Sequence, residues 1–247
     1  MKRIAMIPVR MGSKRIKNKN LRLLGNKPLV AYVIESAKKS GVFDEIYLNS
    51  ESDIFREIAN EYGIKFYKRP EVLATDDATN DDFALDFMDN IDGDILVQLL
   101  ATSPFITPEQ IIEFTNKSES SDTLISTTKV KIESIYKDLP INFDQSKVSP
   151  PSQLLEPVYA YACSLMAWKY DNYKSNMYKY GAGYHGGDGQ IDFFELNGYA
   201  TLDIDEEVDF LLAESILLAK PTRPEYYKSG KVFDHDVERV LAQDGVV

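Results

Sequence analysis

A cluster of basic residues follows an apolar run near the N-terminus of this 247-residue chain. The run spans residues 4–9, and the five cations that follow it within ten residues are Arg10, Lys14, Arg15, Lys17 and Lys19. A buried strand that ends in such a loop can bind polyphosphate, because backbone N–H groups near Gly12 and Ser13 approach the oxygens while the cations neutralise them. Solvated loop lysines are the structural alternative. The sequence favours an anion site, because nine basic residues and no acidic residue precede Glu35 in a chain of formal net charge -11.

Two phosphate-binding loops with well-defined spacing are absent from this segment. It has no GxxxxGKS/T pattern, which argues against a P-loop ATPase, and no GxGxxG pattern, which argues against a dinucleotide-binding site. We therefore assign the polyphosphate to Arg10, Lys14 and Lys19, with Gly12 and Ser13 supplying backbone contacts.

A second pattern with chemical meaning is Asp203-Ile204-Asp205, which follows an apolar stretch and precedes a predicted helix. In a strand, residues two apart point to the same side, so both carboxylates can face one point. Neighbouring carboxylates repel each other unless a cation lies between them, and Mg²⁺ suits such hard oxygen ligands together with substrate phosphates. In the structural alternative, Asp205 caps the helix and Asp203 is a surface residue. Combined with the cationic loop, the pair favours a magnesium site.

Strands and helices must alternate to position these residues. Apolar runs predict strands over residues 4–9, 45–49, 64–67, 94–100 and 123–127. Helix starts are indicated by Pro28 and by three capping patterns, which are Ser50 with Asp53, Thr79 with Asp82, and Thr107 with Gln110. Such alternation predicts an α/β fold with a mostly parallel, doubly wound sheet. Ligands of these sheets bind beyond the carboxyl ends of the strands, where the basic loop would lie.

Composition excludes several classes of protein. A hydrophobic content of 44%, with 15 Tyr and 12 Phe, suits one packed core and argues against disorder. The negative net charge argues against a nucleic-acid partner, and no apolar run approaches the length of a membrane span. The single cysteine, Cys163, cannot form an internal disulfide, so we expect it to be buried in packing and the protein to be cytoplasmic. His185 lies in a glycine-rich stretch and is expected to be solvated.

Longer motifs resemble one known family. The stretch IPVRMGSKRIKNKNLRLLGNKPL resembles the N-terminal signature of the acylneuraminate cytidylyltransferases, or CMP-sugar synthetases, which is close to IPARxGSKxxxxKN followed by GKPL. The likeness continues through FDEIYLNSES, KRPEVLATDDA, TSP and LDIDEEVDF, in order, and covers most of residues 3–215.

The resemblance implies a Rossmann-like nucleotidyltransferase fold and a homodimer. It implies transfer of CMP from CTP to a small acidic acceptor, with Mg²⁺ at Asp203 and Asp205. By the same resemblance, Asn20 contacts the cytosine base and Arg69 helps to hold the nucleotide.

The resemblance also divides the chain. Residues 1–128 and 196–219 are expected to form the nucleotide-binding core, which the chain re-enters through a strand at residues 200–204. Residues 129–195 are expected to form an inserted region that pairs two subunits and supplies part of the acceptor site. Residues 220–247 are a C-terminal extension, expected to pack against the partner subunit.

Departures from the family pattern concern the acceptor. Sialate-activating members usually read LLQPTSPLR where this chain reads LLATSPFI, so Leu100 and Ile106 replace a glutamine and an arginine. The later stretch YACSLMAW stands where the family commonly has an NGAIY-like sequence. A nonulosonate, an octulosonate or a phosphonate therefore remain alternatives as acceptor. Two other functions stay open, namely a sugar-phosphate nucleotidyltransferase that uses another NTP and a non-catalytic nucleotide-binding protein.

Overall fold

The computed structural model of this protein describes residues 1–219. Residues Met1–Glu214 form one compact unit, and the fold below is the fold of that unit. The predicted C-terminal extension, with its expected packing against a partner subunit, lies outside the described residues.

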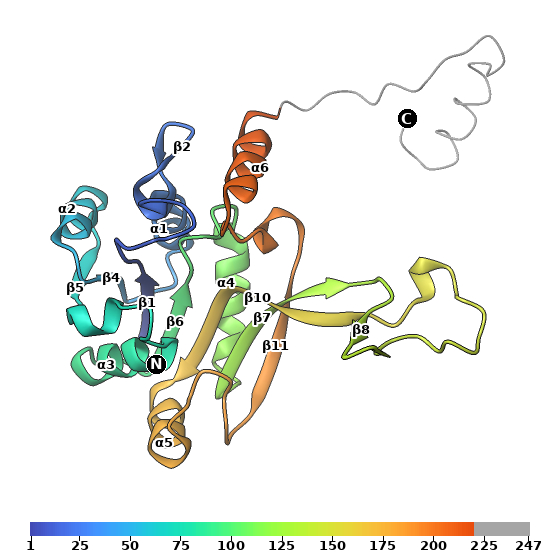
Figure 1. Ribbon diagram of the computed structural model, residues 1–247. Helices are drawn as coiled ribbons and strands as arrows, with labels where there is room; N and C mark the ends of the chain where they lie inside the picture. Colours follow the sequence, from blue (N-terminus) through green and yellow to red (C-terminus); the bar gives the residue numbers. More distant parts are fainter. Residues whose placement is uncertain (220–247) are drawn as a thin grey trace, which may run out of the picture. The chain divides into compact units, whose positions relative to one another are not determined.

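A seven-stranded sheet in the order β11-β7-β10-β6-β1-β4-β5 forms the centre of this unit (Figure 1). Strand β1 pairs in parallel with β4 and β6, whereas β10 is antiparallel to both β6 and β7. The predicted mostly parallel sheet is therefore confirmed, with β6 as its middle strand. The strands are β1 Arg3–Pro8, β4 Glu45–Ser50, β5 Lys65–Lys68, β6 Ile95–Leu99, β7 Thr123–Val130, β10 Val158–Lys169 and β11 Ile191–Leu196.

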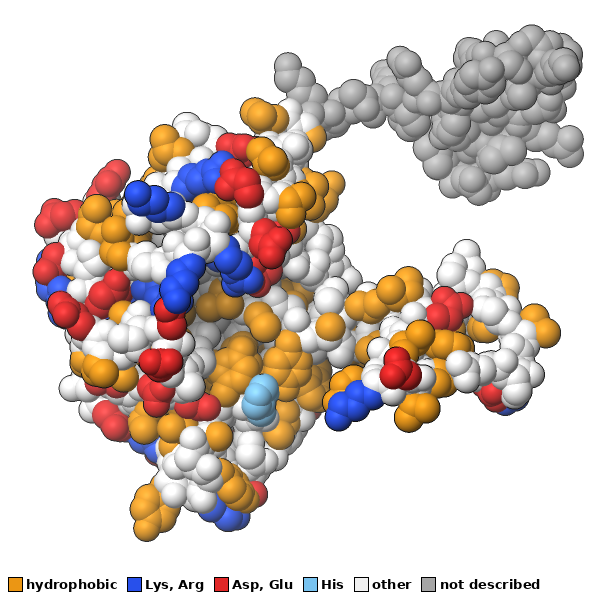
Figure 2. All heavy atoms as spheres, in the orientation of Figure 1, with side chains coloured by type: hydrophobic (Ala, Val, Ile, Leu, Met, Phe, Trp, Pro, Cys, Tyr) orange, Lys and Arg blue, Asp and Glu red, His pale blue; other side chains and the backbone are white. Residues whose placement is uncertain are grey.

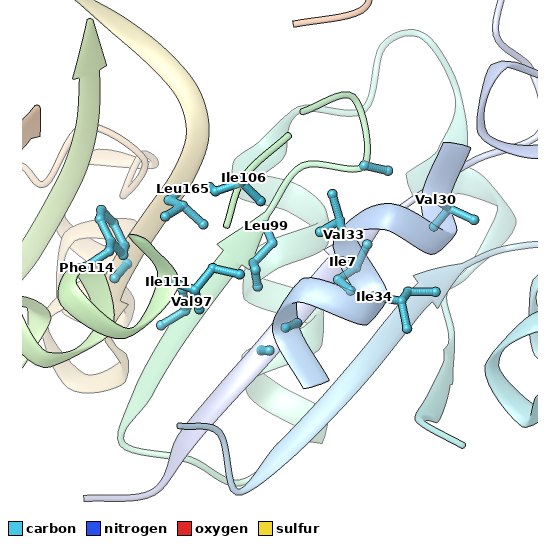
Figure 3. Packing of buried hydrophobic residues seen from close by; sticks show 14 of the residues in the cluster. Ile7, Val30, Val33, Ile34, Val97, Leu99, Ile106, Ile111, Phe114 and Leu165 are labelled. Atoms are coloured by element: carbon cyan, nitrogen blue, oxygen red, sulfur yellow. The ribbon is translucent and has the colours of Figure 1, made fainter. Parts of the chain in front are cut away.

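Helices cover both faces of the sheet. Alternate residues of β1 point to opposite faces, so Ile7 packs in one core with α1, α2 and α4, while Met6 packs in another with α3 and α5. Figure 3 shows the first of these cores. The sheet is thus doubly wound, as the sequence predicts. The helices are α1 Leu29–Ser40, α2 Asp53–Tyr62, α3 Asn80–Asn90, α4 Pro108–Ser118, α5 Tyr170–Tyr180 and α6 Glu207–Leu218.

Short elements complete the connections. They are the 3₁₀ turns η1 Lys19–Leu21, η2 Glu71–Ala74, η3 Ser152–Leu154 and η4 Gly198–Thr201, and the short strands β2 Leu23–Leu24, β3 Lys27–Pro28, β8 Ile135–Tyr136 and β9 Leu139–Pro140. Among the described residues, no helix is both long and apolar enough to cross a membrane.

Two of the three predicted capping boxes are confirmed. The hydroxyl groups of Thr79 and Thr107 each accept a hydrogen bond from the backbone N–H three residues later. The side chains of Asp82 and Gln110 accept from the backbone N–H of these threonines in turn. The box predicted at Ser50 is wrong, because β4 continues through Ser50 and helix α2 starts after Ser52. The Ser50 hydroxyl instead accepts a bond from the Ser52 N–H at 3.3 Å.

The predicted extent of the insertion is also wrong. Residues 129–195 include β10 and β11, and β10 lies inside the main sheet between β6 and β7. Only the segment 131–157, with the β8–β9 hairpin, projects beyond the ends of β7 and β10 (Figure 1). No strand forms at 200–204, where η4 leads into extended backbone. Helix α5 joins the core because Tyr173 buries its ring against that of Trp168 in β10.

Candidate functional site

One pocket of about 640 Å³ lies at the carboxyl ends of β1 and β6. Figure 2 shows basic side chains gathered at one side of a hollow on this face. Eight of the nine site residues predicted from the sequence line the pocket: Arg10, Ser13, Lys14, Lys19, Asn20, Arg69, Asp203 and Asp205. The ninth, Gly12, does not, and the Ser13 N–H already donates to the Met11 carbonyl at 2.6 Å. The structure therefore gathers the predicted side chains but has no preformed backbone cradle at Gly12 and Ser13.

A small apolar cluster holds the cationic loop against the Asp203-Asp205 segment. Ile16, in the middle of the loop, is 3% exposed and packs with Leu29, Ile204 and Phe210. Residues that are about 190 positions apart in the chain are thereby brought together by burial of apolar surface.

Lys19 bonds directly to the aspartate segment. Its ammonium donates to the Ile204 carbonyl at 2.6 Å and to Asp205 Oδ1 at 3.0 Å. The Arg15 guanidinium lies 3.0 Å from the same oxygen. Lys19 is only 12% exposed at its side chain, so this ion pair is partly shielded from water. Arg15 was not predicted as a site residue, although it belongs to the predicted cationic loop.

Asp203 lines the same pocket, but its carboxyl is affected mainly by burial. Burial raises the pKa of its carboxyl, and the neighbouring Asp205 charge raises it further, against a hydrogen bond from Thr102. Its Oδ1 is buried and has no hydrogen-bond partner among the described residues. A partnerless carboxylate oxygen at the edge of a cationic pocket is a ligand that suits a hard divalent cation.

The donor set fits Mg²⁺ better than a metal held by protein alone. Within residues 1–219, no three His, Cys, Asp or Glu side chains cluster as metal ligands. Mg²⁺ commonly takes one or two carboxylates and completes its shell with waters and substrate phosphates. Asp205 does not cap the following helix through its side chain as the structural alternative had it. Asp209 accepts the N–H groups of Asp205 and Glu206 instead, at 2.9 and 2.7 Å.

Arg10 and Lys14 share one counter-ion, Asp76. The Arg10 guanidinium lies 3.1 Å from Asp76 Oδ1 and also donates to the carbonyls of Ala74 and Thr75. The Lys14 ammonium pairs with the other oxygen of Asp76 and, as the largest influence, lowers the pKa of that carboxyl. Two of the predicted triphosphate cations are therefore paired with one protein carboxylate, which offsets part of their positive charge.

Asp76→Asn is accordingly expected to strengthen the binding of inorganic pyrophosphate by about two- to fivefold, the scale of an exposed ion pair. The reason is that, without the Asp76 carboxylate, Arg10 and Lys14 bind phosphate without first breaking an ion pair. Isothermal titration calorimetry measures the change, and Asp77→Asn, at the exposed neighbour, is the matched control. Weaker binding by Asp76→Asn would mean that Asp76 organises the cations instead of competing for them.

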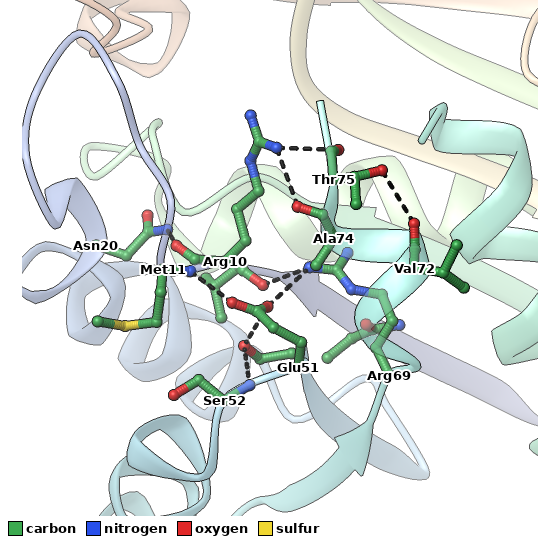
Figure 4. A network of polar contacts seen from close by, with 12 residues as sticks. Arg10, Met11, Asn20, Glu51, Ser52, Arg69, Val72, Ala74 and Thr75 are labelled. Atoms are coloured by element: carbon green, nitrogen blue, oxygen red, sulfur yellow. Dashed lines mark hydrogen bonds and ion pairs between the residues drawn. The ribbon is translucent and has the colours of Figure 1, made fainter. Parts of the chain in front are cut away.

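Arg69 fixes the start of the cationic loop through a hydrogen bond to its backbone (Figure 4). It is 3% exposed, donates to the Val9 carbonyl at 2.7 Å and lies 3.5 Å from Glu51. Burial lowers the pKa of its guanidinium, and Glu51 opposes that shift. Glu51 in turn accepts the Met11 N–H at 2.8 Å, so this pair holds both sides of Arg10. Sequence reasoning did not identify Glu51, because nothing distinguishes it from the other acidic residues that follow predicted strands.

Asn20 also lines the pocket. It is 7% exposed, and its amide reaches the Arg10 carbonyl only at 3.5 Å. Its Oδ1 is buried without a hydrogen-bond partner in the described residues. This oxygen is therefore free to accept a hydrogen bond from a bound ligand.

Cys163 is not buried in packing as predicted. It is half-buried and lines the pocket, at a shift in strand register between Tyr161 and Met166 of β10. Its φ of 56° lies in the left-handed region, and burial raises the pKa of its thiol. Sequence patterns do not reveal such a bulge. Thr102, Leu100 and Tyr184 also line the pocket. Thr102 had a signal in the TSP motif and Leu100 in its departure from the family's glutamine, whereas Tyr184 had none. His185 is exposed, as predicted.

Comparison with known proteins places the chain in a family. A family model described as Cytidylyltransferase matches residues 4–145. The N-acylneuraminate cytidylyltransferase of Escherichia coli O18:K1:H7 is 33% identical over 177 residues, which are 70% of this chain and 38% of that protein. The CMP-N,N'-diacetyllegionaminic acid synthase of Legionella pneumophila is 38% identical over 117 residues, which are 45% of this chain and 50% of that protein. The matched segments thus span half or less of these relatives.

A solved structure agrees in fold. A CMP:2-keto-3-deoxy-manno-octonic acid synthetase complexed with CTP has a TM-score of 0.66 and 15% identity, covering 88% of this chain and 98% of that chain. This likeness confirms the Rossmann-like nucleotidyltransferase fold. Because the family model spans more than half of the sequence, the chain belongs to the cytidylyltransferase family, and the predicted resemblance to its acylneuraminate members is confirmed.

Proposed function

We propose that this protein transfers CMP from CTP to an acidic sugar and releases pyrophosphate. One observation carries the proposal: the cationic loop and the Asp203-Asp205 segment meet in a single pocket at the carboxyl ends of the strands. Positive charge for a triphosphate and oxygen ligands for its metal are what nucleotidyl transfer requires. The named activities of the E. coli and L. pneumophila relatives agree with this choice of nucleotide and acceptor.

The reaction is a displacement at the α-phosphorus of CTP. A hydroxyl oxygen of the acceptor forms the new P–O bond, the bond to the bridging oxygen of the β-phosphate breaks, pyrophosphate leaves, and the hydroxyl proton passes to water. Arg10, Lys14 and Lys19 neutralise the triphosphate, and Lys19 acts where charge develops on the leaving group. Asn20 and Arg69 contact the nucleoside side of the substrate.

Mg²⁺ is the cofactor in this proposal, with Asp203 and Asp205 as its protein ligands. When bound, it supplies charge neutralisation at the reacting phosphate oxygens. The chain's own part is orientation, because Lys19 and Arg15 hold Asp205, while Asp203 lines the pocket and has a buried oxygen without a hydrogen-bond partner among the described residues.

A homodimer and a cytoplasmic location complete the proposal. The β8–β9 hairpin leaves Ile135, Tyr136 and Leu139 63–69% exposed, and apolar side chains on a projecting hairpin suit a subunit interface. A single cysteine in the sequence is consistent with a reducing compartment.

The test is Mg²⁺-dependent pyrophosphate release with each of the four NTPs against a panel of acidic sugars and phosphonates. We expect release with CTP and an acidic sugar only. Release with another NTP and a sugar phosphate would favour a different nucleotidyltransferase. No release with any pair, together with measurable CTP binding, would favour a non-catalytic nucleotide-binding protein.

A further inference from the structure

Arg15 is a residue of the cationic loop that contacts a proposed metal ligand. It lines the pocket, and its guanidinium lies 3.0 Å from Asp205 Oδ1. The Lys19 ammonium contacts the same oxygen, also at 3.0 Å. One carboxylate oxygen therefore faces two protein cations in this structure.

The two cations differ in how firmly the protein holds them. The Lys19 side chain is 12% exposed and has a second bond, to the Ile204 carbonyl at 2.6 Å. The Arg15 side chain is 61% exposed, and Asp205 is its only ion-pair partner within residues 1–219. An exposed ion pair of this kind contributes little to stability. Lys19 is thus a fixed part of the site, whereas Arg15 can leave Asp205 at small cost.

The backbone of Arg15 stays in place when its side chain turns. The next residue, Ile16, is 3% exposed and packs with Ile204 and Phe210. This contact holds the loop against the Asp205 segment by burial of apolar surface. Because Arg15 lines the pocket, a polyphosphate bound there offers oxygens to the same guanidinium, and the exchange requires no refolding of the loop.

A divalent cation and Arg15 compete for the Asp205 carboxylate. Two positive charges at hydrogen-bond distance from one carboxylate repel a further cation that approaches it. A polyphosphate reverses this balance, because the planar guanidinium binds phosphate oxygens in a bidentate arrangement. Arg15 then exchanges one oxyanion for another, and Asp205 becomes available to a metal.

We infer that Arg15 is a further polyphosphate-binding residue, which in the free protein covers Asp205 and keeps divalent cations from it until a polyphosphate binds. This inference rests on the proposed function for the metal site at Asp205. Its consequence is that the cation and the polyphosphate each favour binding of the other, by the same factor.

The test measures the two ligands separately on the full chain. Mn²⁺ is used in place of Mg²⁺, because carboxylates suit both ions and electron paramagnetic resonance measures free Mn²⁺ directly. Inorganic pyrophosphate is titrated by calorimetry in the presence of EDTA. Arg15→Gln should bind Mn²⁺ about two- to fivefold more tightly than the unmodified chain, the scale of one exposed ion pair. It should bind pyrophosphate about tenfold more weakly, the scale of one charge-assisted hydrogen bond.

Lys17→Gln is the matched control, because Lys17 is an exposed cation of the same loop that does not line the pocket. It removes the same charge, so a general effect of net charge appears in both variants. In an Asp205→Asn background, Arg15→Gln should no longer change the affinity for Mn²⁺, because the carboxylate that Arg15 covers is gone.

Three results would overturn the inference and leave the proposed transfer of CMP intact. They are equal behaviour of Arg15→Gln and Lys17→Gln in either titration, a shift of the reverse sign, and a gain in Mn²⁺ affinity that persists in the Asp205→Asn background. Opposite shifts in the two titrations, without pyrophosphate release from any NTP, would support the role of Arg15 and contradict the transferase instead.

Discussion

Lys19→Met is expected to lower kcat/KM for CTP by about 10²–10³-fold, the scale for removal of one preorganised charge at a reacting group. The Lys19 ammonium bonds to the aspartate segment at both Ile204 and Asp205, and its side chain is only 12% exposed. Methionine keeps the apolar length of the side chain but neither the charge nor the bonds to Ile204 and Asp205. Steady-state pyrophosphate release over a range of CTP concentrations measures the loss.

Lys17→Met is the control, because Lys17 is exposed on the same loop and does not line the pocket. It removes the same charge from the same segment, so any general effect of net charge on CTP approach appears in both variants. An equal, small loss in the two variants would mean that Lys19 serves only long-range attraction of the nucleotide.

The α/β core could be predicted because its signals are local. Helix α4 begins at Pro108 after its N-cap Thr107, where a capping box and a proline fall within four residues, and the structure confirms all of these signals. At Ser50 a similar pattern predicted a helix start that is wrong. Ser50 pairs with Lys68 of β5, so β4 continues through the predicted N-cap residue. A bond between strands that are distant in sequence outweighs a local preference here, and single-residue patterns do not report such pairing.

The extent of the insertion could not be predicted for the same reason. The apolar run in β10 is visible in the sequence, but its place between β6 and β7 depends on partners about 30 to 70 residues away. Its register shift also sets the left-handed backbone at Cys163. Resemblance to a family with an insertion assigned this strand to the wrong region.

The main charges of the site could be predicted because topology brings them together. In a doubly wound sheet, loops after parallel strands meet at one edge, which places the basic loop after β1 beside the residues that follow β6. Asp203 and Asp205 reach this edge without a strand before them, because the Ile204 N–H bonds to the Thr102 carbonyl and the Ile204 side chain packs with Ile16. Their internal partners could not be predicted. Asp76 and Glu51 are single acids in an acidic chain, and only the folded structure shows that one pairs with Arg10 and the other with Arg69.

The two aspartates differ in a way that separates catalysis from stability. Asp203→Asn is expected to lower kcat by about 10²–10³-fold, because an amide is a poor Mg²⁺ ligand at a site where the metal stabilises developing charge. The same substitution should raise the melting temperature of the ligand-free protein. Burial raises the pKa of Asp203, so its ionised form is disfavoured in the folded state, and a neutral amide of the same shape removes that cost. Differential scanning calorimetry without Mg²⁺ measures this change.

The sign of the pH dependence follows from the same shift. Because folding raises this pKa, the folded state binds the proton more tightly, so the contribution of Asp203 to stability is largest below its unfolded pKa and is lost as pH rises through its folded pKa. The gain from Asp203→Asn should therefore be present at neutral pH and vanish in acid. Asp205→Asn is the matched comparison: Asp205 is paired with Lys19 and Arg15, so the Asp205→Asn protein should lose activity without a rise in melting temperature. Gains of equal size in both variants would contradict the different roles given to the two carboxylates, and Mg²⁺-dependent activity retained by Asp203→Asn would remove Asp203 from the metal site.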